Sequence, residues 1–259
     1  MQKHRFYAPK NQISGNRAFL LAEEAHHLSR VLRLAAGDEV YIFDGEGADY
    51  KCRISAVTKD GVEVDVVETL KYETESPVHI TLAQALAKGE KFDLVVQKAT
   101  ELGVSEITPL ETEHTDVRLR DERTEKKTER WRRISLEALK QCGRSRLVRI
   151  NPPVTVGELL SQIKAKACLA LLFSEQGGHT IGEAIERTIG GKHDLTGVAA
   201  LVGPEGGWSA EELALMIESG CVPVTLGPRI LRTETAAIVA VTLIQHHLGD
   251  LSSVSGASE

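Results

Sequence analysis

Apolar and polar positions follow two different patterns along the chain, and the first lies near the amino end. Valine-rich runs alternate with polar residues from residue 39 onward and are interrupted by the turn sequences Asp44-Gly45 and Asp60-Gly61. An alternation with a period of two, bounded by such turns, is typical of short β-strands. We therefore expect strands at 39–43, 50–57 and 62–67.

A short helical stretch at 23–32 precedes these strands, and a polar stretch at 72–76, closed by Pro77, follows them. Short strands with tight turns indicate a small β-barrel domain over residues 1–72. The polar stretch then reads as an interdomain linker.

After Pro77, apolar runs of strand length alternate with amphipathic stretches, which predicts a larger domain over residues 77–251. The predicted strands are 78–85, 106–110, 147–150, 168–173, 198–202 and 222–226. The predicted helices are 90–102, a basic helix around Trp131, 233–248, and three that begin at the capping boxes Thr155-x-x-Glu158, Thr180-x-x-Glu183 and Ser209-x-x-Glu212. Strands alternating with helices favour an α/β fold with a mostly parallel sheet covered on both faces. The small, polar residues 252–259 are expected to form a disordered tail.

Composition narrows the class of protein. No apolar run approaches the roughly 20 residues of a membrane span, and residues 1–15 lack the apolar centre of a signal peptide. We therefore expect a soluble, cytoplasmic protein with no membrane partner. The four cysteines, at 52, 142, 168 and 221, form no Cys-x-x-Cys pair, so reduced thiols and no metal site are expected.

The net charge of −6 disfavours a nucleic-acid partner only if the charge is evenly spread. Residues 118–149 carry 12 Lys or Arg against 5 Asp or Glu, so this segment is basic within an acidic chain. Such a segment suits docking to phosphates. On charge alone, the better interpretation is a solvated helix with ion pairs between residues such as Glu129 and Arg133.

Three loops are expected at the carboxyl ends of parallel strands, where ligands bind in open α/β sheets. They are Ser174–Gly178, Gly203–Trp208 and Gly227–Thr235, and the last two both begin with Gly-Pro. Glycine allows a close approach of the backbone to a ligand. Gly-Pro turns follow two successive predicted strands, at Gly203 and Gly227, so we expect them to form the wall of a ligand pocket at this edge of the sheet. No phosphate-binding Gly-x-x-x-x-Gly-Lys and no Gly-x-Gly-x-x-Gly follows a strand, which disfavours nucleoside triphosphates and dinucleotides.

Both Gly-Pro loops resemble the cofactor loops of the RsmE family in the SPOUT superfamily of RNA methyltransferases. The matching segments are Leu201–Gly207 with Ser209 and Glu212, and Leu226–Ala236. The resemblance continues through Lys88–Lys91, Gln97–Val104, Gln141–Arg144, Arg5–Tyr7 and His27–Arg33, so it covers nearly the whole chain. One departure is Thr112-Glu113-His114, because the family commonly has Ser-Glu-Arg there. His114 is either a substitute polar contact or an exposed loop residue.

The resemblance implies a PUA-like RNA-binding barrel before a SPOUT α/β domain with a carboxy-terminal trefoil knot. It also implies a homodimer that uses S-adenosylmethionine to methylate N3 of a uridine in 16S ribosomal RNA of the small ribosomal subunit. The implied cofactor-binding residues are Leu172, Phe173, Leu201, Val202, Gly203, Pro204, Glu205, Gly206, Gly207, Leu226, Gly227, Pro228, Ile230, Leu231, Thr235 and Ala236.

N3 of uridine carries a proton, and loss of this proton leaves negative charge on the ring that a guanidinium would stabilise. Arg232 and Arg229 are therefore catalytic candidates, and Glu234 is a candidate to orient an arginine or accept the proton. Glu205 is another possible base, and Glu234 could equally be a helix-start carboxylate. For RNA we expect contacts from Arg5, Arg30, Arg33, Arg144 and Arg146.

Two alternatives remain. The first is a SPOUT enzyme acting on transfer RNA or on a 2′-hydroxyl. The second is a non-catalytic RNA-binding protein on the same scaffold.

Overall fold

The computed structural model describes residues 4–70, 74–115, 122–166, 168–189 and 197–252. Contacts divide the chain into two compact units. The first comprises Met1–Glu75 with Leu136–Leu147, and the second comprises Ser76–Ser135 with Val148–Glu259. The linker expected at 72–76 lies partly, and the tail expected at 252–259 lies almost wholly, outside the described residues.

The first unit is built on a six-stranded sheet with the order β1-β4-β5-β6-β3-β2. Its strands are β1 (Arg5–Tyr7), β2 (Ile13–Ser14), β3 (Arg17–Leu20), β4 (Glu39–Phe43), β5 (Asp49–Val57) and β6 (Val62–Leu70). All neighbours pair antiparallel except β1 with β4. The three predicted strands are confirmed as β4, β5 and β6. The pairings of the described residues follow an open path that does not join β1 to β2, so they do not show the closed barrel that was expected.

A 3-10 turn (Lys10–Gln12), helix α1 (Ala22–His26) and a π-helical turn (His27–Val31) complete the strand-bearing part of this unit. Arg33, two residues after the π-helical turn, is left-handed, with φ of 57°. Inward residues of the sheet, including Phe6, Val40, Cys52 and Val64, pack around one apolar core.

The second unit contains a parallel sheet with the order β10-β8-β7-β12-β11-β13, with β9 beside β8. The strands are β7 (Ile80–Ala85), β8 (Glu106–Glu111), β9 (Arg149–Ile150), β10 (Val154–Thr155), β11 (Leu169–Phe173), β12 (Val198–Val202) and β13 (Val222–Val224). The helices are α2 (Lys91–Glu101), α3 (Glu122–Cys142), α4 (Val156–Lys166), α5 (Ile181–Ile189), α6 (Ala210–Glu218) and α7 (Thr233–Leu248). From Leu136 onward, α3 belongs to the first unit.

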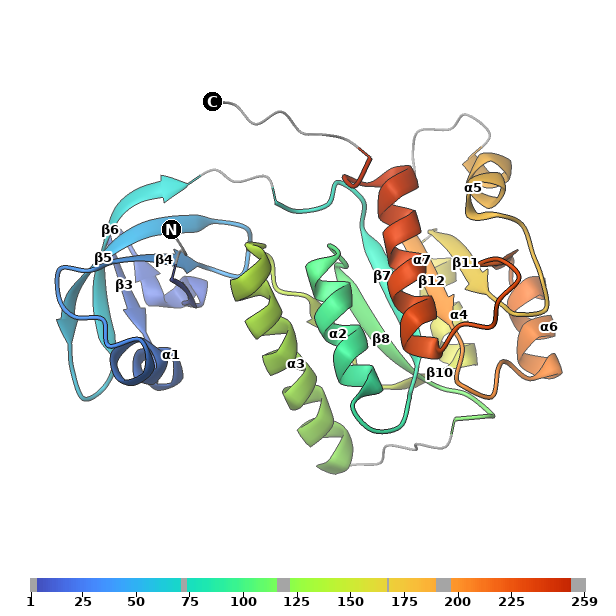
Figure 1. The fold of residues 1–259 in the computed structure, drawn as a ribbon, viewed down its shortest axis with the longest axis horizontal. Coiled ribbons are helices and arrows are strands. Elements are labelled where there is room, and N and C mark those ends of the chain that lie inside the picture. Colours follow the sequence, from blue (N-terminus) through green and yellow to red (C-terminus); the bar gives the residue numbers. More distant parts are fainter. Residues whose placement is uncertain (1–3, 71–73, 116–121, 167, 190–196, 253–259) are drawn as a thin grey trace. The chain divides into compact units, whose positions relative to one another are not determined.

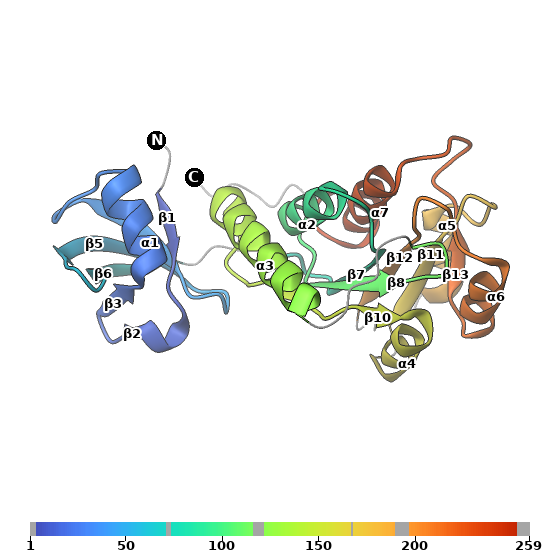
Figure 2. The same ribbon diagram turned by 90° about the horizontal axis from the view of Figure 1, so that it is seen from below.

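Helices cover both faces of the parallel sheet, as predicted (Figures 1 and 2). Alternate strand residues point to opposite faces, so Leu171 joins a core with residues of α2, α5 and α7, whereas Leu172 joins a core with residues of α4 and α6. Helices α2 and α7 lie side by side on the same face of the sheet, near the centre of Figure 1. Buried on both faces, these strands read as continuous apolar runs.

The four cysteine thiols are free. Burial raises the pKa of Cys52 to about 12 and that of Cys221 to about 11, so both are protonated at neutral pH. Within the described residues, no helix has the length and apolar character needed to cross a membrane.

Candidate functional site

A cavity of about 490 Å³ lies at the carboxyl ends of β11, β12 and β13. Its lining comes from the loops that follow these three strands, from the start of α7 and from Lys91 of α2. The volume is in the range that accommodates a nucleoside-sized ligand. Parallel strands end at the same sheet edge, so loops far apart in sequence meet there.

Trp208 joins two of these loops. Its indole Nε1 donates a hydrogen bond to the backbone oxygen of Phe173 at 3.0 Å. The indole also lies beside Gly203, where a Cβ atom would approach the ring to 3.0 Å. A side chain at Gly203 would therefore press on Trp208, and this is the reason for glycine there.

A buried hydroxyl joins the second loop to the third. Thr233, the first residue of α7, donates from Oγ1 to the backbone oxygen of Gly203 at 2.7 Å. Thr233 Oγ1 in turn accepts a hydrogen bond at 2.9 Å from Nε2 of Gln84, which lies at the end of β7. Gln84 is fully buried, and its Oε1 has no hydrogen-bond partner among the described residues. The chain Gln84–Thr233–Gly203 thus fixes the loop after β12 against the helix that follows the next loop.

Two further glycines leave room in the loops. Gly207 and Gly227 have positive φ of 70° and 97°, and a Cβ atom at either would meet nothing within 4 Å. Both line the cavity. Their backbone can therefore approach a ligand without an intervening side chain.

Charged side chains surround the cavity. Arg229 and Arg232 line it and are exposed. Lys91 and Glu205 also line it and form an ion pair with each other. Glu234 is half-buried in the first turn of α7, and its Oε2 has no hydrogen-bond partner among the described residues.

Most of the residues expected around the cofactor line this one cavity: Phe173, Val202, Gly203, Pro204, Glu205, Gly206, Gly207, Leu226, Gly227, Ile230, Leu231 and Ala236. The catalytic candidates Arg229 and Arg232 lie among them.

Five expected residues do not line the cavity: Leu172, Leu201, Glu234, Pro228 and Thr235. Leu172 and Leu201 are fully buried in the core beneath α4 and α6. They point away from the cavity because side chains alternate along a strand, so only Phe173 and Val202 at the strand ends reach it. Pro228 and Thr235 are exposed outside the lining.

The cofactor-binding residues expected from the sequence did not include Gln84 behind the lining, nor these residues of the lining: Lys91, Ser174, Glu175, Gln176, Trp208, Leu213 and Thr233. Trp208 and Thr233 lie within the motifs that were singled out, so their types could have suggested a role. Gln84 gives one signal in the sequence, because its amide lies between two alanines near the end of a largely apolar strand.

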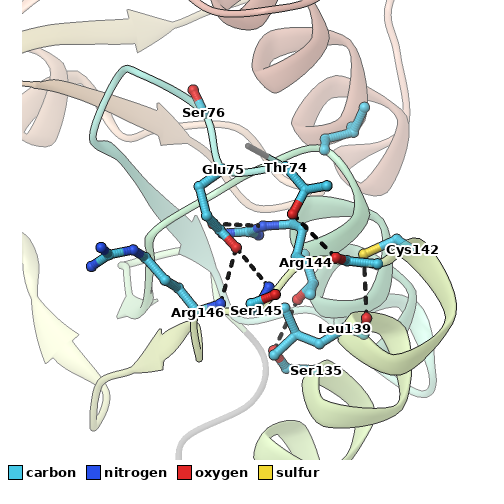
Figure 3. A network of polar contacts seen from close by, with 12 residues as sticks. Thr74, Glu75, Ser76, Ser135, Leu139, Cys142, Arg144, Ser145 and Arg146 are labelled. Carbon is cyan, nitrogen blue, oxygen red and sulfur yellow. Dashed lines mark hydrogen bonds and ion pairs between the residues drawn. The ribbon is translucent and has the colours of Figure 1, made fainter. Parts of the chain in front are cut away.

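Of the five arginines expected to bind RNA, Arg144 is buried in the first unit and Arg5 is partly buried there, with its side chain largely covered. The guanidinium of Arg5 lies 2.6 Å from Oδ1 of Asp49 and donates to the backbone oxygens of Leu139 and Arg144 at 3.0 and 3.2 Å. Arg144 donates to Oε2 of Glu75 from Nε and Nη2, at 3.0 and 2.7 Å (Figure 3). These surroundings do not support phosphate docking by Arg5 or Arg144, because their guanidinium groups are occupied and shielded from solvent.

Arg30, Arg33 and Arg146 are exposed. The backbone N–H of Arg146 donates to Oε1 of Glu75 at 2.9 Å, while its side chain points away from that carboxylate (Figure 3). Arg30 and Arg33 could instead pair with Glu23, Glu24 or Asp38 and only steady the unit. Two of these carboxylates are engaged elsewhere, since Glu24 pairs with Lys140 at 2.9 Å and Asp38 accepts from the N–H of Ala35 at 2.8 Å.

Ion pairs are present along the basic helix α3. Glu129 lies 3.6 Å from Arg132 and 3.9 Å from Arg133, and Arg130 pairs with Asp93 at 2.5 Å. The ion-paired, solvated helix that charge alone favoured thus describes part of α3.

The chain matches the models of two known protein families. The RNA methyltransferase domain matches residues 74–245, and the RNA methyltransferase PUA domain matches residues 20–67. Ribosomal RNA small subunit methyltransferase E of Bacillus subtilis is 31% identical over 247 residues, which cover 95% of this chain and 96% of that protein. The corresponding protein of Synechocystis is 33% identical over 93% of this chain and 77% of its own length.

Solved structures agree with the sequence matches. Ribosomal RNA small subunit methyltransferase E from Neisseria gonorrhoeae, bound to S-adenosylmethionine, has a TM-score of 0.86 and 32% identity over 96% of this chain and 99% of that one. A putative methyltransferase from Legionella pneumophila, in complex with the same cofactor, has a TM-score of 0.87 and 36% identity over 97% and 100% of the two chains. By fold and by sequence over nearly its whole length, the chain belongs to the RsmE family of RNA methyltransferases, with a PUA-like amino-terminal part.

Proposed function

We propose that this protein is an S-adenosylmethionine-dependent methyltransferase that methylates N3 of a uridine in 16S ribosomal RNA of the small ribosomal subunit, in the cytoplasm. The observation that carries the proposal is the cavity lined by both glycine loops and the start of α7. Relatives named ribosomal RNA small subunit methyltransferase E support the RNA and the subunit. The nitrogen methylated is what the family resemblance implies.

The cavity fits the cofactor by its chemistry. Phe173, Leu226 and Leu231 supply apolar wall for an adenine ring. Gly207 and Gly227 leave backbone groups accessible to ribose and carboxylate oxygens. S-adenosylmethionine, when bound, supplies an electrophilic methyl group on a positively charged sulfur. The carboxylate of S-adenosylmethionine could form ion pairs with Arg229, Arg232 or Lys91.

The acceptor chemistry assigns roles to the same arginines. When N3 loses its proton, negative charge spreads onto the flanking carbonyl oxygens of the uracil. A guanidinium of Arg229 or Arg232 beside those oxygens would stabilise this charge. Glu234, whose Oε2 is buried without a partner in the described residues, is our candidate to orient an arginine or accept the proton.

The test is nucleoside analysis of small-subunit RNA from a strain without this gene, before and after incubation with purified protein and S-adenosylmethionine. We expect 3-methyluridine to appear only after incubation. A methyl group on a 2′-hydroxyl, or on transfer RNA instead, would favour the related enzyme classes. Calorimetry that shows no cofactor binding to folded protein would favour a non-catalytic RNA-binding protein.

We also propose that the chain of the second unit forms the trefoil knot of the family and that two copies associate through this unit. Ile238, Val239 and Leu243 of α7 are apolar and only half-buried within one chain. A second copy would cover them. Light scattering should give twice the mass of one chain at micromolar concentration, and Val239→Glu should give the mass of one. A parent protein with the mass of one chain would contradict the dimer.

A further inference from the structure

Helix α3 carries its charges on separate faces. Between residues 123 and 133, five cations recur at intervals of three or four residues, and we call them the basic stripe: Arg123, Lys126, Lys127, Arg130 and Arg133. Side chains at these intervals share one face of a helix. The acidic residues of the same stretch, Glu125 and Glu129, are four residues apart and lie on a neighbouring face. Positive charge is therefore concentrated along one side of the helix.

The packing of α3 leaves the basic stripe outside its contact with α2. Trp131 is buried, its ring lies 4.4 Å from that of Phe92, and its Nε1 donates to Oδ1 of Asp93 at 3.1 Å. One turn further along α3, the hydroxyl of Ser135 lies 3.0 Å from that of Thr100. Trp131 and Ser135 thus mark the face that packs on α2, beside which α3 lies in Figures 1 and 2. The helix is fixed in this orientation before any partner binds.

The basic stripe is exposed and only partly neutralised. Four of its five cations are exposed, and Lys127 is half-buried. The ion pairs of Arg130 and Arg133 leave their side chains 59% and 67% exposed. Arg123 and Lys127 form no ion pair with any residue that the structure describes. The stripe therefore presents an excess of positive charge to solvent, although the whole chain has a net charge of −6.

The residue types of the stripe indicate which form of RNA it suits. Its cations span ten residues of helix, or about 15 Å. Between residues 123 and 133, all of which the structure describes, the one aromatic side chain is the buried Trp131. Single-stranded RNA is bound largely by aromatic side chains that stack on its bases, whereas duplex RNA is recognised through its phosphates and its shape. A fixed row of cations without stacking groups therefore fits the phosphate backbone of a duplex.

We propose that the basic stripe of α3 docks a duplex segment of the substrate RNA through its phosphates. The contact is independent of base sequence, because phosphates carry no sequence information. It lies outside the cofactor cavity, since none of the five cations lines that cavity. The stripe belongs wholly to the second unit, so it adds an RNA contact to those expected from the arginines of the first unit. The proposal rests on the proposed function only for the identity of the partner as RNA.

The test measures binding of an RNA hairpin, with a stem of about 16 base pairs, to the double variant Arg123→Gln, Lys127→Gln. The control, Lys164→Gln with Arg187→Gln, removes the same two charges from exposed positions of α4 and α5. Fluorescence anisotropy without cofactor gives the affinity across a salt series. At about 0.1 M salt the stripe variant should bind about tenfold or more weakly, and its slope of log affinity against log salt should fall by roughly one unit per cation or slightly less. The control should match the parent.

Three results would overturn the docking surface. The first is a parent protein that does not bind the hairpin, and the second is an unchanged affinity and salt slope in the stripe variant. The third is an equal loss in the control, because the effect would then follow net charge alone. A single-stranded RNA of the same length tests the form of the RNA, since an equal loss on it would contradict the assignment to a duplex.

Methyl transfer is measured separately from binding. A parent protein that binds the hairpin through the stripe and transfers no methyl group would contradict the proposed function and leave the docking surface intact.

If the stripe variant is unfolded by circular dichroism, acetylation of lysines in the parent protein with acetic anhydride replaces it. The hairpin should protect Lys126 and Lys127 and leave Lys164 reactive. Equal acetylation of Lys126 and Lys127 with and without the hairpin would contradict the proposal.

Discussion

At the scale of single residues, the hydroxyl of Thr233 connects the two glycine loops of the cofactor cavity. It donates to Gly203 at 2.7 Å and accepts from the buried Gln84 at 2.9 Å. The carbonyl of Gly203 is therefore turned toward α7 and held there. Removal of the hydroxyl leaves this carbonyl and the amide of Gln84 without their partner in a buried place.

We expect Thr233→Val, which keeps the shape and removes the hydroxyl, to weaken S-adenosylmethionine binding by about tenfold, equivalent to about 1.4 kcal/mol. The wall formed by Gly203 would no longer be fixed before the ligand arrives, so the KM for cofactor should rise more than kcat falls. Thr233→Ser keeps the hydroxyl and should bind within about twofold of the parent. Equal affinities for the valine and serine variants, measured by calorimetry, would show that the hydroxyl does not position the loop.

From the sequence, the segments that line the cavity could be predicted better than the directions in which their side chains point. The Gly-Pro loops locate the lining because backbone freedom is a local property of glycine. Whether Leu172 or Phe173 faces the cavity depends on which helices cover each face of the sheet, and this is set by tertiary packing. Leu172 lies in the core between the sheet and the helices α4 and α6.

At the scale of elements, helix starts were predicted well because capping is local. Ser209 accepts from the N–H of Glu212, whose carboxylate accepts from the N–H of Ser209, and α6 begins at Ala210. The capping boxes at Thr155 and Thr180 precede α4 and α5 in the same way. The strands β1, β2, β3 and β10 were missed, because two to four residues are too short to show a period.

Glu106 connects β8 to α4. Burial by itself would raise its pKa, but hydrogen bonds from Asn151 and Lys166 outweigh burial and lower the pKa to about 2. In the unfolded chain, the carboxyl group has the ordinary glutamate pKa of 4.5. The folded state therefore binds fewer protons than the unfolded state between these values, and the stabilisation is complete only above them.

The free energy of unfolding should consequently fall as the pH decreases from about 4.5 toward about 2, with Glu106 accounting for at most about 3 kcal/mol of the loss. Glu106→Gln should be less stable than the parent at pH 6, and the difference should shrink at pH 3. Urea unfolding at the two pH values measures it. Glu186→Gln, an exposed exchange on α5, should show no such convergence. A difference independent of pH would mean that the charge of Glu106 is not what stabilises the contact.

At the scale of the whole molecule, the division into two units follows contacts that sequence spacing does not reveal. The segment 136–147 belongs with the amino-terminal strands. Within that unit, Arg5 reaches Asp49 and the hydroxyl of Ser145, and Glu75 receives Arg144. Arg5 and Arg144 were predicted to bind RNA because arginine suits phosphate. In the fold, each instead forms an ion pair with a carboxylate that is distant in the sequence.

RNA docking to the first unit is therefore expected from its exposed arginines, and Arg30, Arg33 and Arg146 are our candidates on that unit. A guanidinium that neutralises a phosphate releases a counterion, so binding weakens with salt in proportion to the number of such contacts.

The double variant Arg30→Ala, Arg33→Ala should bind RNA more weakly and reduce the slope of log affinity against log salt by roughly one unit per arginine or slightly less. Cofactor affinity should not change. Arg144→Ala is the contrasting variant, because it removes the cation from the half-buried Glu75 and leaves its Oε2 without the two guanidinium hydrogen bonds. It should lower the melting temperature while the salt slope stays that of the parent. Fluorescence anisotropy across a salt series distinguishes the two outcomes, and an unchanged RNA affinity in the double variant would remove Arg30 and Arg33 from the binding surface.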